Sequence, residues 1–254
     1  MTRWRGIVVP VALLVLAEIA FRTSVGSSDS LAPPSRVATA LLEVLGDGSL
    51  LAGTAKTLGT MLTGLALGAL SGLAAGIALG FSETLRRAAF LTVEMLRPIP
   101  SVALLPLSLL IFGFGYRMEV AVIAFATFWP SLILTQSAVA QIEPRLIEVA
   151  RLLGLTRLQT AWKIVLPAAA PRLMTGLRLA AGLALVVAVT AEIVSNPQGL
   201  GHDLMIAQET LRPERMFAVL FWVGLLGWGK NAALLRLERW LFAHRGEIDT
   251  GVTA

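Results

Sequence analysis

The sequence predicts an all-α, polytopic membrane protein with about six transmembrane helices. Hydrophobic residues make up 56% of the 254 residues and charged residues only 15%, whereas a soluble domain carries about 25% charged residues. Apolar stretches of about 20 residues recur along the chain, and each is long enough to cross a bilayer core of about 30 Å as a helix. The basic residues gather in particular loops. We therefore expect a single transmembrane domain over residues 1–254.

Composition also limits the possible functions. The chain has no cysteine and only two histidines, His202 and His244, far apart in sequence. Thiolate metal sites and cysteine nucleophiles are therefore excluded, and a histidine metal site or a Ser-His-Asp triad has too few residues. The net charge of +5 fits basic loops on one side of a membrane better than nucleic-acid binding. We expect no catalytic residue, no metal site and no nucleic-acid partner.

The first expected span covers residues 4–21 and begins next to Arg3 and Arg5. A secretory signal peptide has a similar pattern, but we interpret this segment as a retained helix because further spans follow it. After a polar stretch, residues 36–45 place apolar side chains on one helical face. This pattern predicts a short amphipathic helix at the membrane surface.

The second expected span, residues 54–80, has a glycine at every fourth position from Gly64 to Gly80. Positions four apart share one helix face. A neighbouring helix can approach such a stripe closely, so we interpret it as a packing surface. A pore-lining role for these glycines is the alternative. A short loop, residues 81–87, is expected to follow.

The third expected span, residues 88–114, contains Arg97 followed by Pro98 and Pro100. Proline removes a helix hydrogen bond, so this span should be kinked or broken. A cation in a broken span can line a substrate path. Arg97, Pro98 and Pro100 are therefore candidate pathway residues. The alternative for Arg97 is an ion pair with Glu94.

Three more spans are expected at residues 119–140, 173–194 and 216–235, and a charged tail follows at residues 236–254. Six spans put both termini on one side of the membrane. Most basic residues fall on that side, together with the long loop at residues 141–172. The positive-inside rule then places the loop and both termini in the cytoplasm.

Carboxylates within or beside the spans are further candidates. A stripe of small residues along the fifth span ends at Glu192, which should point into the bundle near its outer end, as a gate or an inter-subunit hydrogen-bonding group. The alternative is a group that reaches water at the interface. Glu18 and Glu119 lie at span ends, and we interpret them as interfacial. The small residues that form the stripe on the fifth span are Gly176, Ala180, Ala184 and Ala188.

Residues 224–231 nearly match the phosphate-binding G-x4-G-K-[ST] pattern. Asn231 replaces the hydroxyl that binds metal, and no strand precedes the segment, so we expect no nucleotide site here. Lys230 is instead expected to extend to the cytoplasmic interface. The tryptophans of this region are interpreted as interface anchors or lipid-facing groups: Trp222, Trp228 and Trp240.

The loop at residues 141–172 has the clearest local signals. Pro144 suits the first position of a helix, and Gly154 suits the left-handed position that ends one. Thr156 with Gln159 forms a capping box that starts a second helix. We expect this second helix to end at the two prolines that follow it, Pro167 and Pro171.

A helix–turn–helix outside the bilayer is therefore predicted. Helices this short are marginal alone in water. A cytoplasmic partner is expected to cover them.

The same loop resembles the E-A-A-x3-G-x9-I-x-L-P motif of binding-protein-dependent ABC importer permeases, with valine for the first alanine as the one departure. In that family the loop forms a coupling helix that docks into a cleft of the ATPase subunit. The resemblance implies that Glu148 contacts the ATPase and that Gly154 makes the tight turn. The alternative is that these residues only hold the fold of the loop. The implied coupling residues are Glu148, Val149, Ala150, Arg151, Gly154, Ile164, Leu166 and Pro167.

Shorter motifs around Arg97, Glu192, Gly199 and Glu238 are similar to the branch that serves aliphatic sulfonates, taurine and nitrate. The resemblance implies a type I importer permease fold in the inner membrane, assembled with ATPase subunits and an extracytoplasmic binding protein. We expect the second permease of the assembly to be another copy of this chain, in a homodimer, and a heterodimer with a similar chain is the alternative. ATP and Mg²⁺ would be used by the ATPase, so this chain would need no cofactor. We expect a small anion as substrate, and a pyrimidine or vitamin precursor is the alternative.

Another class remains possible on sequence grounds. An ion-coupled secondary transporter or channel would need intramembrane carboxylates and ideally an inverted repeat, and the sequence shows no convincing internal repeat. A membrane-embedded hydrolase lacks the necessary residues.

Overall fold

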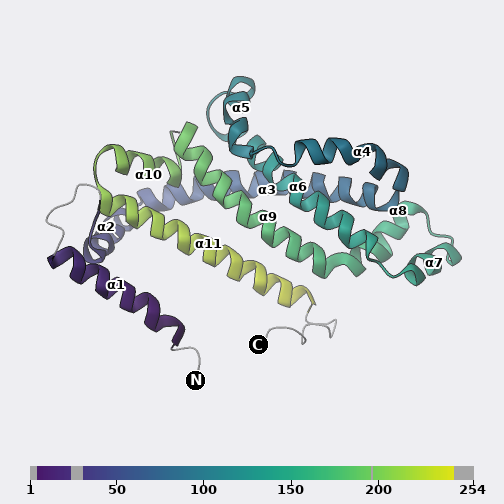
Figure 1. Cartoon of the computed structure of the whole chain (residues 1–254), viewed down its shortest axis with the longest axis horizontal. Coiled ribbons are helices and arrows are strands. Elements are labelled where there is room, and N and C mark those ends of the chain that lie inside the picture. Colours follow the sequence, from purple (N-terminus) through teal and green to yellow (C-terminus); the bar gives the residue numbers. More distant parts are fainter. Residues whose placement is uncertain (1–4, 24–30, 196, 243–254) are drawn as a thin grey trace.

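The computed structural model describes residues 5–23, 31–195 and 197–242, and within these residues every regular element is a helix. Four helical segments of this part of the chain are long and apolar enough to cross a membrane. Figure 1 shows an elongated arrangement in which α3, α6 and α9 run along one another. The four segments are α3 (Ser49–Phe81), α6 (Tyr116–Ala140), Ala161–Ser195, which contains α9 (Leu166–Ser195), and α11 (Pro213–Phe242).

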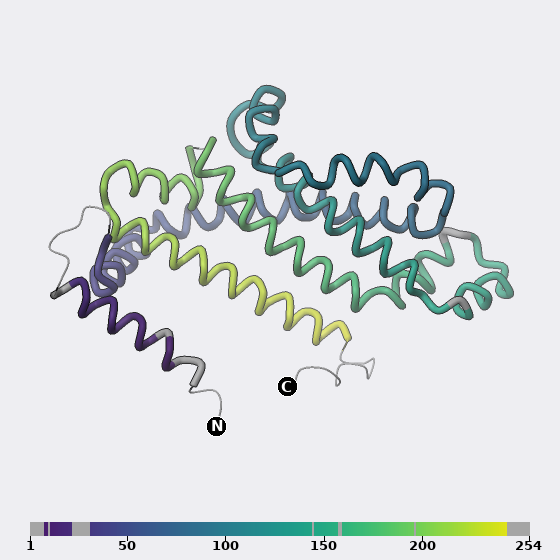
Figure 2. Tube along the Cα trace, viewed as in Figure 1, coloured from purple at the N-terminus to yellow at the C-terminus, as the bar shows by residue number. Residues whose placement is uncertain are grey.

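The third expected span is broken, as its prolines predict. Helix α4 (Glu83–Leu96) is followed by Arg97–Pro100, a short 3-10 turn (Ser101–Leu104) and α5 (Leu105–Phe112). The two halves meet at an angle of 83°, and Figure 2 shows the chain turning sharply away from the bundle at this point. The break exposes polar backbone and the Arg97 side chain beside α6.

The first expected span forms helix α1 (Arg5–Thr23), which contacts α2 at the edge of the structure (Figure 1). Its described apolar segment, Val11–Phe21, is shorter than a full crossing. Trp4 lies outside the described residues. The described part of the chain thus contains up to five candidate spans, counting the broken one, against the six predicted.

The predicted amphipathic helix is α2 (Pro34–Gly46). Its apolar face does not stand free, because Val44 is buried in a small core with Leu50, Leu200 and Val219. Helix α2 therefore packs on the bundle at the end where α10 (Leu200–Glu209) lies.

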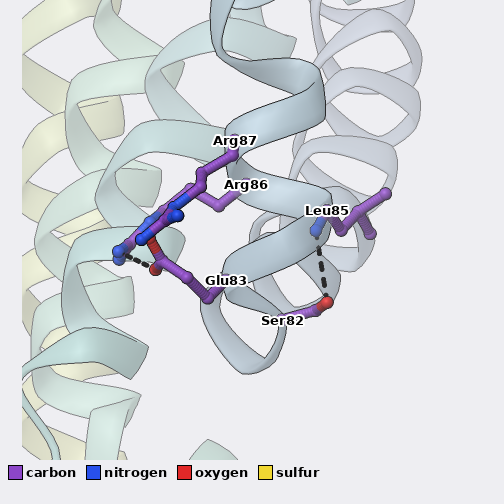
Figure 3. A network of polar contacts seen from close by, with 5 residues as sticks. All are labelled: Ser82, Glu83, Leu85, Arg86 and Arg87. Carbon is purple, nitrogen blue, oxygen red and sulfur yellow. Dashed lines mark hydrogen bonds and ion pairs between the residues drawn. The ribbon is translucent and has the colours of Figure 1, made fainter.

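Residues 81–87 are not a loop, because α4 begins at Glu83. The Ser82 hydroxyl accepts the Leu85 N–H at 3.3 Å and caps the helix. Glu83 in the first turn pairs with Arg86 and, at 2.8 Å, with Arg87 (Figure 3). A capping serine and an acidic first turn favour a helix start here.

The glycine stripe is a packing surface, as predicted. A Cβ atom at Gly72 would lie 2.5 Å from the Phe128 carbonyl oxygen, and one at Gly76 would lie 2.6 Å from that of Leu132. Both contacts are too close for any side chain, so these glycines let the backbones of α3 and α6 touch. Because α6 covers the stripe, the pore-lining alternative is wrong.

The prediction that Pro167 and Pro171 end the second loop helix is wrong. The helix continues through both prolines into α9. A π-helical turn, Ala161–Val165, comes first, and the Leu166 N–H donates to the Ala161 carbonyl five residues back. This wider turn moves the preceding carbonyls away from the place where a proline ring would clash.

The expected tail also begins later than predicted. Helix α11 continues to Phe242, so residues 236–242 are helical. Residues 243–254 lie outside the described part of the chain.

Candidate functional site

The motif loop lies at one end of the structure, opposite α10 (Figure 1). Helix α7 (Pro144–Leu152) ends in a tight turn in which Gly154 has φ +66°. The Leu155 N–H donates to the Ala150 carbonyl and the Gly154 N–H to that of Arg151, both at 3.0 Å. These bonds satisfy the last carbonyls of α7, as the glycine signal predicts.

The predicted capping box is present. The Thr156 N–H donates to Gln159 Oε1 at 2.9 Å, and the Gln159 N–H donates to Thr156 Oγ1 at 3.3 Å. Helix α8 (Arg157–Thr160) starts directly after Thr156. Helix, glycine turn and capped helix therefore give the loop a defined shape.

The loop has an inner and an outer face. Ala150 and Val165 are each 1% exposed and hold the loop against the bundle, and Ile164, Leu166 and Pro167 are half-buried beside them. Glu148, Val149 and Arg151 face outward with Gly154. The outer face also carries three strongly exposed apolar side chains: Leu152, Leu153 and Trp162.

An open cavity of about 920 Å³ lies between α6, α9 and the break after α4. Arg97 and Ser101 line it from the break, Trp129 from α6, and Thr175 and Arg178 from α9. Pro98 and Pro100 do not line it; their contribution is the break itself.

Within the described residues, Arg97 forms no ion pair with Glu94. The two side chains only border a smaller cavity of about 270 Å³ together. The ion-pair alternative for Arg97 is therefore wrong.

Arg178 is a site residue that sequence analysis missed. Its guanidinium pairs with Glu238 of α11, and the two side chains are 30% and 20% exposed. The signal that could have identified Arg178 is its position within the largely apolar stretch at residues 173–194, because a charge inside a span usually faces a partner or a cavity.

Glu192 points into the bundle, as predicted, and is 1% exposed. Its carboxylate accepts the Thr57 hydroxyl at 3.0 Å and the Gly201 N–H at 2.9 Å, so the interfacial alternative is wrong. It does not line the cavity of Arg97. The four candidate pathway residues are therefore not one site: Glu192 joins α3, α9 and α10, and Arg97 borders the cavity.

Two other carboxylates lie near Glu192. Glu119 is 0% exposed, so its interpretation as interfacial is wrong. Asp203 of α10 lies over Gly53, where a Cβ atom would be 3.0 Å from its Oδ2. Burial raises the pKa of the Asp203 carboxyl, and the nearby Arg215 and His202 oppose that rise.

Glu18 lies elsewhere. It accepts the Ser35 hydroxyl at 2.8 Å and so ties α1 to α2.

The interpretation of Lys230 is also wrong, because Lys230 donates to the Ala181 carbonyl of α9 at 2.7 Å instead of extending to the interface. Trp222 donates to the Thr54 hydroxyl of α3 at 2.9 Å instead of facing lipid, and its role as an interface anchor stays a prediction. Trp228 and Trp240 are 72% and 73% exposed, as expected of lipid-facing groups.

Residues 224–231 lie within α11, so they do not form a phosphate-binding loop.

Within the described residues the chain is a bundle of helices with a broken span and a capped helical loop at one end, and four of its helical segments are long and apolar enough to cross a membrane. The chain belongs to a known family: residues 64–242 match the binding-protein-dependent transport system inner membrane component. It is therefore the permease subunit of an ABC importer, a multi-pass inner-membrane protein and not an enzyme. Membership also implies an ATPase and a binding protein as partners.

Relatives and solved structures agree. The chain is 31% identical to the taurine transport system permease protein TauC of Escherichia coli over 86% of this chain and 82% of TauC. It is 29% identical to a putative aliphatic sulfonates transport permease protein of Bacillus subtilis over 96% and 89% of the two chains. A chain of the inward-facing MetNI methionine ABC transporter superposes with a TM-score of 0.68 at 23% identity, covering 75% of this chain and 94% of that one.

Proposed function

We propose that this chain forms the path for a small anion of the sulfonate, taurine or nitrate type, delivered by an extracytoplasmic binding protein. The names of its relatives support this substrate class. The observation that carries it is the cavity bordered by both Arg97 and Arg178. Cations in a water-excluded path attract anions strongly because the local dielectric constant is low.

Coupling to the ATPase takes place through α7. Its outer face combines Glu148 and Arg151 with exposed apolar side chains, of which Leu152 is 87% exposed. An amphipathic helix that ends in a defined turn fits a groove on a partner protein. Val149 and Gly154 belong to this contact. Ile164, Leu166 and Pro167, with the buried Ala150, anchor it to the bundle.

The end of the structure that holds α7 faces the cytoplasm. Arg86 and Arg87 lie at the turn between α3 and α4, and the end of α11 comes close to the start of α9, since Leu241 and Ala170 line one cavity. Basic residues at this end fit the positive-inside rule. Both termini then lie on the cytoplasmic side, and exposed apolar side chains of α1 and α5 contact lipid.

A second copy of the chain completes the path. The cavity of Arg97 is open at the surface of one chain, and closed two-fold pairing is the common way for such subunits to enclose a path. The chain binds no cofactor, because ATP and Mg²⁺ are used by the ATPase.

Transport in proteoliposomes tests the proposed substrate. The chain is reconstituted with its ATPase and binding protein, and uptake of labelled taurine and of nitrate is measured with and without ATP. We expect ATP-dependent uptake of at least one anion, which Arg97→Gln lowers at least about tenfold. Uptake by the chain alone without ATP would support the secondary transporter instead, and uptake of a pyrimidine but no anion would overturn the substrate class.

A further inference from the structure

The cavity between α6 and α9 brings two arginines from distant parts of the chain to one space. Arg97 follows α4 at the break, and Arg178 lies in the middle of α9. A third cation lies close behind, because a Cβ atom at Gly182, which lines the cavity, would be 3.9 Å from Lys230 Nζ. Lys230 itself is held by the Ala181 carbonyl.

The walls between these cations are mostly apolar. Phe125 and Trp129 of α6 contribute aromatic rings whose centroids are 5.6 Å apart, and Leu179 and Leu183 of α9 line the cavity as well. Ser101 adds a hydroxyl group that can donate to an anion, whereas the Thr175 hydroxyl donates to the Pro171 carbonyl at 3.3 Å. A small-molecule site usually has mostly apolar walls and a small number of polar groups.

Arg178 is only partly satisfied within the described residues. One terminal nitrogen pairs with Glu238, while its buried Nε has no hydrogen-bond partner. A guanidinium has five donors in a planar fork, and it binds oxyanions best when two donors act together. Because Arg178 lines the cavity and its side chain is 30% exposed, the donors that do not pair with Glu238 keep the capacity to bind a second oxyanion, and Glu238 compensates the charge when none is present.

We propose that this cavity is a subsite for a small organosulfonate monoanion, held by Arg97 and Arg178, and that Glu238 is a displaceable counter-ion that competes with it. The proposal rests on the function proposed above; it narrows the ligand to an organosulfonate and adds Glu238 as the group that competes with it. A sulfonate offers three acceptor oxygens to the arginines, and its short carbon chain lies against the rings of Phe125 and Trp129.

The competing carboxylate fits a transport path better than a storage site. A site on a path must bind strongly enough to attract its ion and weakly enough to release it. Two arginines without a carboxylate would hold an anion firmly. Glu238 weakens binding by offering Arg178 an internal partner whenever the anion leaves.

The lack of cysteine in the chain permits a direct test. A single cysteine is introduced by Thr175→Cys in the cavity, and a control cysteine by Gln208→Cys at an exposed position of α10, at the other end of the structure. Each variant of the purified chain, without ATPase or binding protein, is labelled with an anionic sulfonatoethyl methanethiosulfonate and with a cationic trimethylammonioethyl methanethiosulfonate. The ratio of the two labelling rates reports the local preference for an anion.

We expect the anionic-to-cationic ratio at Thr175→Cys to exceed that at Gln208→Cys at least about fivefold. Ethanesulfonate should slow anionic labelling at position 175 and not at position 208. Arg178→Gln should lower the ratio several-fold, and Glu238→Gln should raise it, because it frees Arg178.

Protection by ethanesulfonate is the decisive readout, because the change of local charge alone would alter the labelling ratio in opposite directions in the two variants. If Arg178 and Glu238 form the subsite, Arg178→Gln abolishes the protection at position 175 and Glu238→Gln strengthens it. Unchanged protection in both variants, or equal ratios at positions 175 and 208, would overturn the subsite. Since labelling needs no ATPase, a chain that shows the anion preference and yet fails in ATP-driven uptake would contradict the transport proposal and leave the subsite supported.

Discussion

The carboxylate of Glu192 accepts the hydroxyl of Thr57 at 3.0 Å across the packed faces of α9 and α3. The same carboxylate accepts the N–H of Gly201 at the start of α10, and the Thr57 hydroxyl accepts the N–H of Leu200. Two side chains thus join three helices at the end of the bundle opposite α7 (Figure 1).

Glu192→Ala should lower the free energy of unfolding in detergent by about 1–3 kcal/mol, because it removes the contact with Thr57 and leaves the buried N–H of Gly201 without its acceptor. Thermal unfolding followed by tryptophan fluorescence measures the change. Glu209→Ala, at an exposed position of α10, is the matched control and should change stability by less than about 0.5 kcal/mol. Equal effects of the two variants would show that the contact contributes nothing to stability.

The glycine stripe makes a second prediction. Gly72→Ala should destabilise the chain by about 1–3 kcal/mol, since the added Cβ would lie 2.5 Å from the Phe128 carbonyl and would push α3 and α6 apart. Gly59→Ala, on the same helix, meets no atom within 4 Å and should be neutral or stabilising by up to about 1 kcal/mol. The same unfolding assay compares them, and a harmless Gly72→Ala would contradict the close approach of the two helices.

The third prediction concerns the turn after α7. Gly154 has φ +66°, and a Cβ atom there would meet nothing within 4 Å, so the expected cost of Gly154→Val is backbone strain. We expect about 1–2 kcal/mol of local strain, which should weaken ATPase binding while the bundle unfolds at an unchanged temperature. Gly154→Asn should have a smaller effect, because asparagine tolerates the left-handed region. Biolayer interferometry measures the affinity of each variant for the ATPase, and we expect it to fall from wild type to Gly154→Asn to Gly154→Val. Equal affinities of the three proteins would contradict the role of the turn.

Sequence alone predicted features that depend on neighbours in the chain. The break at Pro98 and Pro100, the turn at Gly154 and the capping box of Thr156 with Gln159 are all set within a few residues, by missing donors, by φ and by side-chain acceptors. The prediction that the glycine stripe is a packing surface was confirmed for a related reason, since a helix face without side chains allows close packing.

Features that depend on distant partners were not predicted. Lys230, Trp222 and Glu119 each looked interfacial, because hydropathy cannot show that a particular carbonyl or hydroxyl of another helix lies within reach. The two prolines after the loop were misread for another reason. A π turn at Ala161–Val165 relieves the clash of the Pro167 ring with the carbonyl four residues before it, and no residue pattern in the loop indicates that turn.

Co-purification with the ATPase is the most direct test of whether the loop that contains α7 couples this chain to the ATPase. The tagged chain is isolated from mildly solubilised membranes as wild type, as Glu148→Arg and as the control Glu209→Arg, which reverses an exposed charge at the opposite end of the structure. Mass spectrometry then measures the ATPase retained by each. We expect wild type and Glu209→Arg to retain the ATPase and Glu148→Arg to lose most of it; full retention by Glu148→Arg would contradict the role of α7.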